Sequence, residues 1–400
     1  MNFASFFTTI KHFLWFYKPT EGRFIHLGFV NEGFKRSGIP WVEYDGSQLI
    51  PFCAADDIGI YWLIPRIAHA LDCSVERAIC IFFYGSALFS WTLGIIGFFL
   101  LYRSVVQRFV AFIGLSSLLL LTLYIGDVYI LYSSAAMALM PLGMYLSLND
   151  TKPIYCGIFG VFAGLFVGID HFVRSYCAVP PLLFVLILCW FQRDCARSKK
   201  GILTCAIVVG LMSVVFFTHH QKNRYHAYIH QSYPTARLDN YQHGIWHTIY
   251  CGLGFFKFMN KRNIEWNDSC AQNFIERMRQ NKNNVDLSGE EILKTEIINI
   301  MSNESHFMVF SLFGKIGVLI LFLLLSAQIG LIAAFIVRKP LVIDLSFFIA
   351  FVTSAVFPLL AMPFLTYGLS FISCAVVYNI VSINYAYAQL IQKRSTNYAQ

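Results

Sequence analysis

Two adjacent carboxylates, Asp56 and Asp57, are the side chains whose types and spacing are best suited to chemistry. Like charges in contact raise the pKa of one member, which suits a general base that takes a proton from a hydroxyl or an amine. One or both could instead hold a divalent cation, Mg²⁺ or Mn²⁺, that bridges to a phosphate. A simpler interpretation is that one caps the following helix and its neighbour is solvated. We predict Asp56 and Asp57 as the catalytic pair, and as the metal ligands if the reaction needs a metal; otherwise we expect no cofactor.

A second candidate group lies in a short connection between two apolar runs, at Asp170, His171 and Arg174. A guanidinium group binds phosphate through two parallel hydrogen bonds, so Arg174 suits a lipid-linked phosphate. Alternatively, Asp170 and Arg174 form a local ion pair at four-residue spacing, which contributes little energy. Such a pair would also hold the arginine in place. We predict these three residues as substrate-binding.

A third group combines aromatic rings with an imidazole at Trp246, His247 and Tyr250. Aromatic faces pack against sugar rings, and an imidazole can donate to phosphate or carry a proton. The alternative is an aromatic anchor at a membrane surface. Lys315, near the end of a later apolar run, either contacts a lipid phosphate or extends to the interface. We predict all four as contributors to substrate binding.

The histidines concentrate in one polar stretch, residues 218–306. Its seven members, of eleven in the chain, are His219, His220, His226, His230, His243, His247 and His306. The four-residue spacings 226–230 and 243–247 place pairs on one helical face, which could suit a transition metal. No cysteine or carboxylate completes an obvious ligand set, so solvated or substrate-contacting histidines are favoured. A disulfide between Cys251 and Cys270, or between Cys53 and Cys73, is possible in an oxidising compartment.

The elements that must position these residues are membrane spans, because the chain is 57% hydrophobic and only 13% charged. A soluble domain of 400 residues does not have this composition. We predict an all-α integral membrane protein with nine or ten transmembrane helices. The nine clear runs are residues 79–102, 109–126, 128–148, 154–169, 177–191, 201–217, 314–337, 345–362 and 364–388. Residues 3–17 are a tenth, marginal candidate that is either a span or an interfacial helix.

The distribution of lysine and arginine predicts the orientation, because short cytoplasmic loops retain these residues. One set of connections, with the C-terminal tail, holds Arg103, Arg108, Lys152, Arg193, Arg197, Lys199, Lys200, Arg338, Lys339, Lys393 and Arg394. The opposite short loops hold only Arg174. We therefore expect a cytoplasmic C-terminus. The net charge of +8 is explained by these loops and does not indicate nucleic-acid binding.

Four segments follow from this topology. We predict a first outer segment at 1–78, spans over 79–217, a large outer loop at 218–306 that folds as a small cap, and C-terminal spans with a short tail over 307–400. After the acidic pair, apolar residues recur at helical spacing, which predicts an amphipathic helix lying on the membrane surface despite Pro65. Ser288 to Glu291 has the pattern of a capping box that starts a helix.

The acidic pair in the first outer segment, the amphipathic helix after it, the many spans and the basic residues on the outer face resemble the GT-C superfamily. These are multi-pass glycosyltransferases that use polyprenyl-phosphate-linked sugars. The resemblance implies an inverting transfer to a lipid, glycan or protein acceptor, with Asp56 and Asp57 in the place of the first-loop acid that acts as base or metal ligand. It covers the architecture and this one short motif.

Other functions remain open. A polymerase or ligase of surface polysaccharide would also have a long outer loop, but would depend on outer arginines and histidines. A secondary transporter is less favoured, because the spans are almost uniformly apolar away from their ends. We expect a bacterial inner membrane; the endoplasmic reticulum is the alternative.

Overall fold

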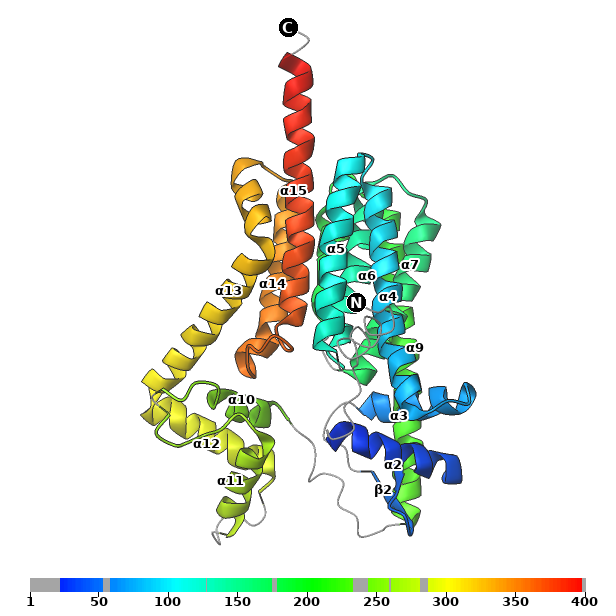
Figure 1. The fold of residues 1–400 in the computed structure, drawn as a ribbon, viewed down its shortest axis with the longest axis vertical. Coiled ribbons are helices and arrows are strands. Elements are labelled where there is room, and N and C mark those ends of the chain that lie inside the picture. The colour runs from blue at the N-terminus through cyan, green and yellow to red at the C-terminus, as the bar shows by residue number, and fades with distance from the viewer. Residues whose placement is uncertain are drawn as a thin grey trace, which may run out of the picture.

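The computed structural model describes residues 22–52, 58–126, 128–174, 178–232, 244–258, 260–280 and 287–397. These residues form fourteen helices and one two-stranded hairpin (Figure 1). The chain is an all-α integral membrane protein, as predicted, because eight helices are long and apolar enough to cross a bilayer. They are α4 (Val75–Leu101), α5 (Val105–Ile125), α6 (Ile130–Leu148), α7 (Pro153–Val173), α9 (Arg197–Ser232), α13 (Ser305–Ile336), α14 (Leu341–Leu360) and α15 (Leu369–Asn397).

The ninth predicted span is the apolar helix α8 (Val179–Phe191), which is shorter than the others. Its 13 residues extend about 20 Å, whereas a bilayer core is about 30 Å thick. Helix α8 packs against α6 and α14. The marginal candidate at residues 3–17 lies outside the described residues.

Helix α6 forms the centre of the bundle, packed between α4, α8 and α15. Almost all of its side chains are buried. The peripheral helices instead expose large apolar side chains: Phe335 is 92% exposed, Leu325 68% and Phe216 66%. Apolar side chains in such numbers on long helices are typical of a surface that contacts lipid.

Small residues allow α7 and α9 to pack along each other more extensively than any other pair. A Cβ atom on Gly164 would lie 2.2 Å from the carbonyl oxygen of Ile207, and one on Gly210 would lie 2.5 Å from that of Val161. Any larger residue at these positions would separate the two backbones. This is the close approach that small residues provide between transmembrane helices.

The helices alternate in direction, so the basic connections and the C-terminus lie at one end of the bundle (Figure 1). We call the opposite end the distal end. It carries two further regions. The N-terminal distal region contains α2 (Gly22–Ser37), β1 (Val42–Tyr44), β2 (Leu49–Pro51), α3 (Ile58–Ala70) and residues 218–232 of α9. The late distal region contains α10 (Ile245–Leu253), α11 (Asp268–Gln280) and α12 (Gly289–Asn303).

Residues 218–306 therefore do not fold as a single cap. Helix α9 continues through Ser232, about 54 Å in all, and its distal end packs into the N-terminal distal region. Tyr225 and Ile229, one helical turn apart, are buried in the same apolar cluster as Trp41. The apolar run ended at residue 217, but a helix continues wherever its next turns find a packing partner.

Helix α3 is present as predicted, and part of its apolar stripe packs against α2 and α4. Ile60 and Ile64 are 1% and 0% exposed and pack in a cluster with Phe24, Leu27 and Phe83. Leu63 and Ile67 are half-buried and Leu71 is 55% exposed, so the position of this helix at the membrane surface stays a prediction. The hairpin beneath α2 pairs Val42 with Pro51 and Tyr44 with Leu49 in antiparallel register.

Candidate functional site

A cavity of about 350 Å³ lies at the distal end where α3, α7 and α9 meet. One face of α9 lines its length, with Leu211, Val214 and Val215 followed by Thr218, His219 and Lys222. These positions recur at three- and four-residue spacing, so they share one face of the helix. The face changes from apolar to cationic along its length. The cavity therefore suits an occupant with an apolar body and an anionic end.

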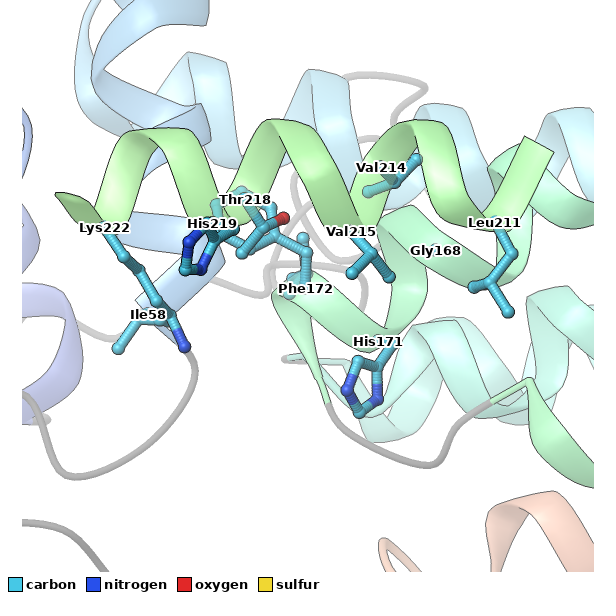
Figure 2. A pocket seen from close by; sticks show the side chains of 11 residues that line it. Ile58, Gly168, His171, Phe172, Leu211, Val214, Val215, Thr218, His219 and Lys222 are labelled. Atoms are coloured by element: carbon cyan, nitrogen blue, oxygen red, sulfur yellow. The ribbon is translucent and has the colours of Figure 1, made fainter. Parts of the chain in front are cut away.

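The cationic end of the cavity is formed by α9. Figure 2 shows the side chains of His219 and Lys222 extending from that helix, with the lysine directed toward Ile58. Among the described residues, no carboxylate lies within 4.0 Å of the Lys222 ammonium. An ammonium without a carboxylate partner is available for an anionic ligand.

Two further arginines increase the positive charge nearby. The Arg66 guanidinium lies 3.9 Å from the ring centre of Trp62 and donates to the Trp62 carbonyl at 2.8 Å. Burial, and then the charge of Arg224, lower the pKa of Arg66 to about 10. Trp62 in turn packs edge-to-face on Phe172 and donates to the Gln221 side chain at 3.2 Å. Trp62 thus holds the Arg66 guanidinium near the cavity wall at Phe172 without neutralising its positive charge.

His171, in the last turn of α7, lines the same cavity. Its predicted neighbours Asp170 and Arg174 are 2% and 8% exposed, so both are buried beside it. The predicted local ion pair between them is wrong: the contact that joins them is the backbone hydrogen bond from Arg174 to the Asp170 carbonyl, at 2.6 Å. The Asp170 Oδ2 atom has no hydrogen-bond partner among the described residues.

Arg174 lies against aromatic rings at the junction with α14. Its guanidinium carbon is 5.3 Å from the ring centre of Tyr129 and 6.0 Å from that of Phe357. Cation–π contacts of this kind help to hold a guanidinium in a fixed position. Of the three residues predicted here, His171 therefore lines the cavity and the other two are packed next to it.

The acidic pair Asp56 and Asp57 lies outside the described residues, but the residue after it does not. Ile58 lines the cavity, and its carbonyl accepts a hydrogen bond from the Trp41 indole at 2.8 Å. At the next position, a Cβ atom on Gly59 would lie 2.3 Å from the Phe172 carbonyl oxygen. Only glycine lets the start of α3 abut the end of α7 this closely. The start of α3, which follows the pair directly in sequence, is thus fixed at the cavity.

The third predicted group, Trp246, His247 and Tyr250, lies in α10 and builds the late distal region. The Glu290 carboxylate accepts hydrogen bonds from the backbone N–H groups of Trp246 and His247, both at 3.0 Å. Tyr250 is buried, and its ring centre lies 5.3 Å from that of Phe274. No described contact connects the three residues to the cavity, and the contacts described for them lie within their own region, so their role in substrate binding stays a prediction.

Lys315 is neither at the membrane interface nor available to a phosphate. It is 3% exposed, and its ammonium donates to the carbonyls of Leu359, Leu360 and Ala361 at 3.0, 3.5 and 2.7 Å. These three bonds use all the donors of the ammonium and satisfy the C-terminal end of α14. The interpretation of Lys315 as a phosphate ligand is wrong for this reason.

Sequence reasoning missed Lys222 as part of the cavity lining. The sequence does contain a pattern that could have identified Lys222. If the helix is extended past residue 217, one of its faces carries in turn Leu211, Val215, Thr218 and Lys222. Comparison of the chain with family models, with curated proteins and with solved structures finds no match.

Proposed function

We propose that this protein is a membrane glycosyltransferase that transfers a sugar from a polyprenyl-phosphate-linked donor to a lipid, glycan or protein acceptor. The observation that supports it is the cavity between α3, α7 and α9, apolar along the membrane and cationic at its distal end. This combination fits a phosphate on a long apolar chain. A water-soluble sugar nucleotide would have no use for the apolar half.

In this proposal the polyprenyl chain lies along Leu211, Val214 and Val215, and the phosphate lies against His219 and Lys222. The positive charge of Lys222 and a hydrogen bond from His219 at that point stabilise the charge that develops on the leaving phosphate. His171 lines the same end of the cavity and can donate a hydrogen bond to a phosphate oxygen.

Asp56 and Asp57 act on the acceptor. One carboxylate takes the proton of the acceptor hydroxyl as its oxygen attacks the anomeric carbon, while the bond from that carbon to the phosphate oxygen breaks. The electron pair of that bond leaves with the phosphate, and the single displacement inverts the anomeric configuration. A divalent cation, Mg²⁺ or Mn²⁺, would be held by the same pair and would neutralise phosphate charge.

The cellular setting belongs to the same proposal. The basic connections at the C-terminal end support a cytoplasmic C-terminus, with the cavity on the periplasmic or lumenal face. We propose the bacterial inner membrane, with the endoplasmic reticulum membrane as the alternative.

The test is turnover of lipid-linked sugars by the full-length protein in nanodiscs. The probes are undecaprenyl phosphates carrying radiolabelled glucose, mannose, galactose or arabinose, offered with membrane extract as a source of acceptor. We expect loss of label from at least one probe, and a reduction of about 10²- to 10⁴-fold in Asp56→Asn or Asp57→Asn. Asp194→Asn, an exposed carboxyl at the opposite end, is the matched control and should keep full turnover. Stable lipid-linked label with every probe contradicts the proposal.

A polysaccharide polymerase or ligase is the second candidate, because the ionisable side chains described in the cavity are His171, His219 and Lys222 and not carboxylates. The two functions separate by substitution. Retained turnover in Asp56→Asn and Asp57→Asn, with loss in His171→Ala and His219→Ala, favours the polymerase or ligase. Loss of turnover in Asp56→Asn or Asp57→Asn favours the glycosyltransferase, in which the histidines also contact the donor phosphate.

A further inference from the structure

We infer that His247, Cys251 and Asp268 in the late distal region form a binding site for one transition-metal ion of the zinc type. Their ligand atoms all lie within 4.8 Å of one another. The His247 Nε2 and Asp268 Oδ1 atoms are 3.0 Å apart. Two atoms at this separation can both reach an ion at the usual bond length of about 2.1 Å. The inference does not depend on the proposed function.

The local fold brings the three ligands together from two helices. His247 and Cys251 are four residues apart in α10 and therefore share one of its faces. Asp268 is the first residue of α11, and its neighbour Asn267 accepts the Cys251 thiol hydrogen at 3.6 Å through its carbonyl. The thiol of α10 is thus directed at the beginning of α11, where the carboxylate lies.

The backbone around the site is held firmly enough to preserve this arrangement. Glu290 of α12 caps the start of α10 through two N–H groups. A Cβ atom on Gly244 would lie 2.2 Å from the Glu290 carboxylate, so a larger residue there would displace the carboxylate from this position. On the other side, the Asn267 side chain caps α11 by accepting from the Cys270 N–H at 2.7 Å. Both ligand-bearing helices therefore begin at fixed points.

The donor set selects the class of metal. One imidazole nitrogen, one thiolate and one carboxylate oxygen suit Zn²⁺ and its analogue Co²⁺, whereas Mg²⁺ and Ca²⁺ prefer oxygen alone. His247 and Cys251 are each 5% exposed, while the Asp268 side chain is 63% exposed. The site is therefore shielded on one side and open on the other, where a water molecule can serve as fourth ligand. Binding releases the Cys251 thiol proton to solvent and replaces its hydrogen bond to Asn267.

From the sequence alone, no cysteine or carboxylate completes an obvious four-ligand set around the histidines, whereas the structure places one of each beside His247. The sequence-based interpretation paired His247 with His243, which lies outside the described residues. The partners of His247 are instead a cysteine one helical turn later and a carboxylate 21 residues away. His226 and His230, the other predicted pair, are both exposed on α9.

The experiment is a Co²⁺ titration of the full-length protein in detergent after treatment with a chelator. We expect one Co²⁺ per chain with a thiolate-to-cobalt charge-transfer band that Zn²⁺ abolishes by displacement. Cys251→Ser should remove the band. Cys205→Ser, at an exposed cysteine elsewhere, and the double variant His226→Ala with His230→Ala should retain it. A band that persists in Cys251→Ser, or Co²⁺ bound without any such band, overturns the inference.

A second measurement avoids any variant that fails to fold. X-ray absorption at the zinc edge of the Zn²⁺-loaded wild-type protein should show one sulfur together with nitrogen and oxygen neighbours. A shell of nitrogen and oxygen alone would mean that surface histidines hold the ion, and it contradicts the inference. A Cys251–Cys270 disulfide, detected by mass spectrometry of the purified protein, contradicts it as well.

Discussion

The two distal regions use their charged side chains in different ways. In the late distal region, charges are paired with one another or with backbone groups. Arg262 binds both Glu296 and Glu304, and Glu290 and Glu291 cap two helices. The hydrogen bond to Glu304 is the main reason that the pKa of Arg262 is raised. In the N-terminal distal region, α2 and the hairpin also pair their charges, Arg36 with Glu32 and His26 with Glu43. The exception is residues 218–232, which carry Lys222 and Arg224 and contain no carboxylate.

Whether a charge has a partner indicates whether it stabilises the fold or can bind a ligand. A charge that already has a partner of opposite sign contributes to folding and has little left for a ligand. The positive charge of a basic side chain that packs on aromatic rings, or that has no carboxylate nearby, remains available to attract an anionic ligand. We therefore expect substitutions in the late distal region to change stability and substitutions at the cavity to change binding.

The largest effect on stability should come from Lys315→Met, which removes the support that α13 gives to the end of α14. Three carbonyls lose their donor in a buried position, and each unsatisfied group costs about 1–3 kcal/mol. We expect a loss of roughly 3 kcal/mol, measured as a lower midpoint of thermal unfolding in detergent. Lys257→Met, at an exposed lysine close in sequence to α10, should unfold at the wild-type temperature. Equal midpoints for both variants would contradict the structural role of Lys315.

A smaller effect is expected for Gly164→Ala, which tests the packing that forms the wall of the cavity. The added methyl group would lie 2.2 Å from a backbone oxygen of α9, so the helices must separate. Overpacking of this kind costs about 1–3 kcal/mol. The matched change Gly201→Ala meets no atom within 4 Å and should be neutral or stabilising by up to about 1 kcal/mol. The same unfolding assay compares them, and a Gly164→Ala protein as stable as Gly201→Ala would show that the close approach is absent.

Lys222→Ala should weaken the binding of undecaprenyl phosphate about tenfold and leave the unfolding midpoint unchanged. The lysine has no described carboxylate to leave unpaired, and one charge-assisted hydrogen bond contributes about 1.5–3 kcal/mol. Binding to the protein in nanodiscs is measured by native mass spectrometry. A lower unfolding midpoint with unchanged lipid binding would contradict this prediction, because Lys222 would then stabilise the fold and not bind the lipid.

Lys294→Ala should have the smallest effect, and it tests whether the late distal region takes part in lipid binding. This exposed lysine of α12 lies 5.9 Å from the ring centre of Trp246, in the region that we consider structural. We expect undecaprenyl phosphate binding within about twofold of wild type, since an exposed cation–π contact contributes only about 0.5–1 kcal/mol to folding. A loss as large as that of Lys222→Ala would mean that the lipid contacts both regions.

The spans could be predicted because apolar runs are a property of the sequence alone, and all nine correspond to apolar helices. The capping box at Ser288 and Glu291 is also confirmed, since its partners are three residues apart. The length of α9 could not be read from hydropathy. Its distal turns are held by contacts such as the Tyr225 hydroxyl bond to the Phe52 carbonyl at 2.8 Å, between residues 173 positions apart.

The same limit applies to the candidate site. His171 was identified from its place at the end of a span, and it lines the cavity. Lys222 was missed because nothing local distinguishes it from other lysines until α7 and α9 are packed together. Lys315 was misassigned because its carbonyl partners belong to the end of another helix, 44 to 46 residues away. Reasoning from local pattern identifies elements, whereas the partners of a charge depend on tertiary contacts.

The most direct test of the cavity is photo-crosslinking of the full-length protein in nanodiscs with a polyprenyl phosphate that carries a diazirine next to the phosphate. We expect the label on peptides from the end of α7 and from residues 211–222 of α9. Excess undecaprenyl phosphate should compete for it, and neutral undecaprenol should not. Label on α10 to α12, or equal competition by the phosphate and the alcohol, would contradict the assignment of the cavity to a phosphate-bearing lipid.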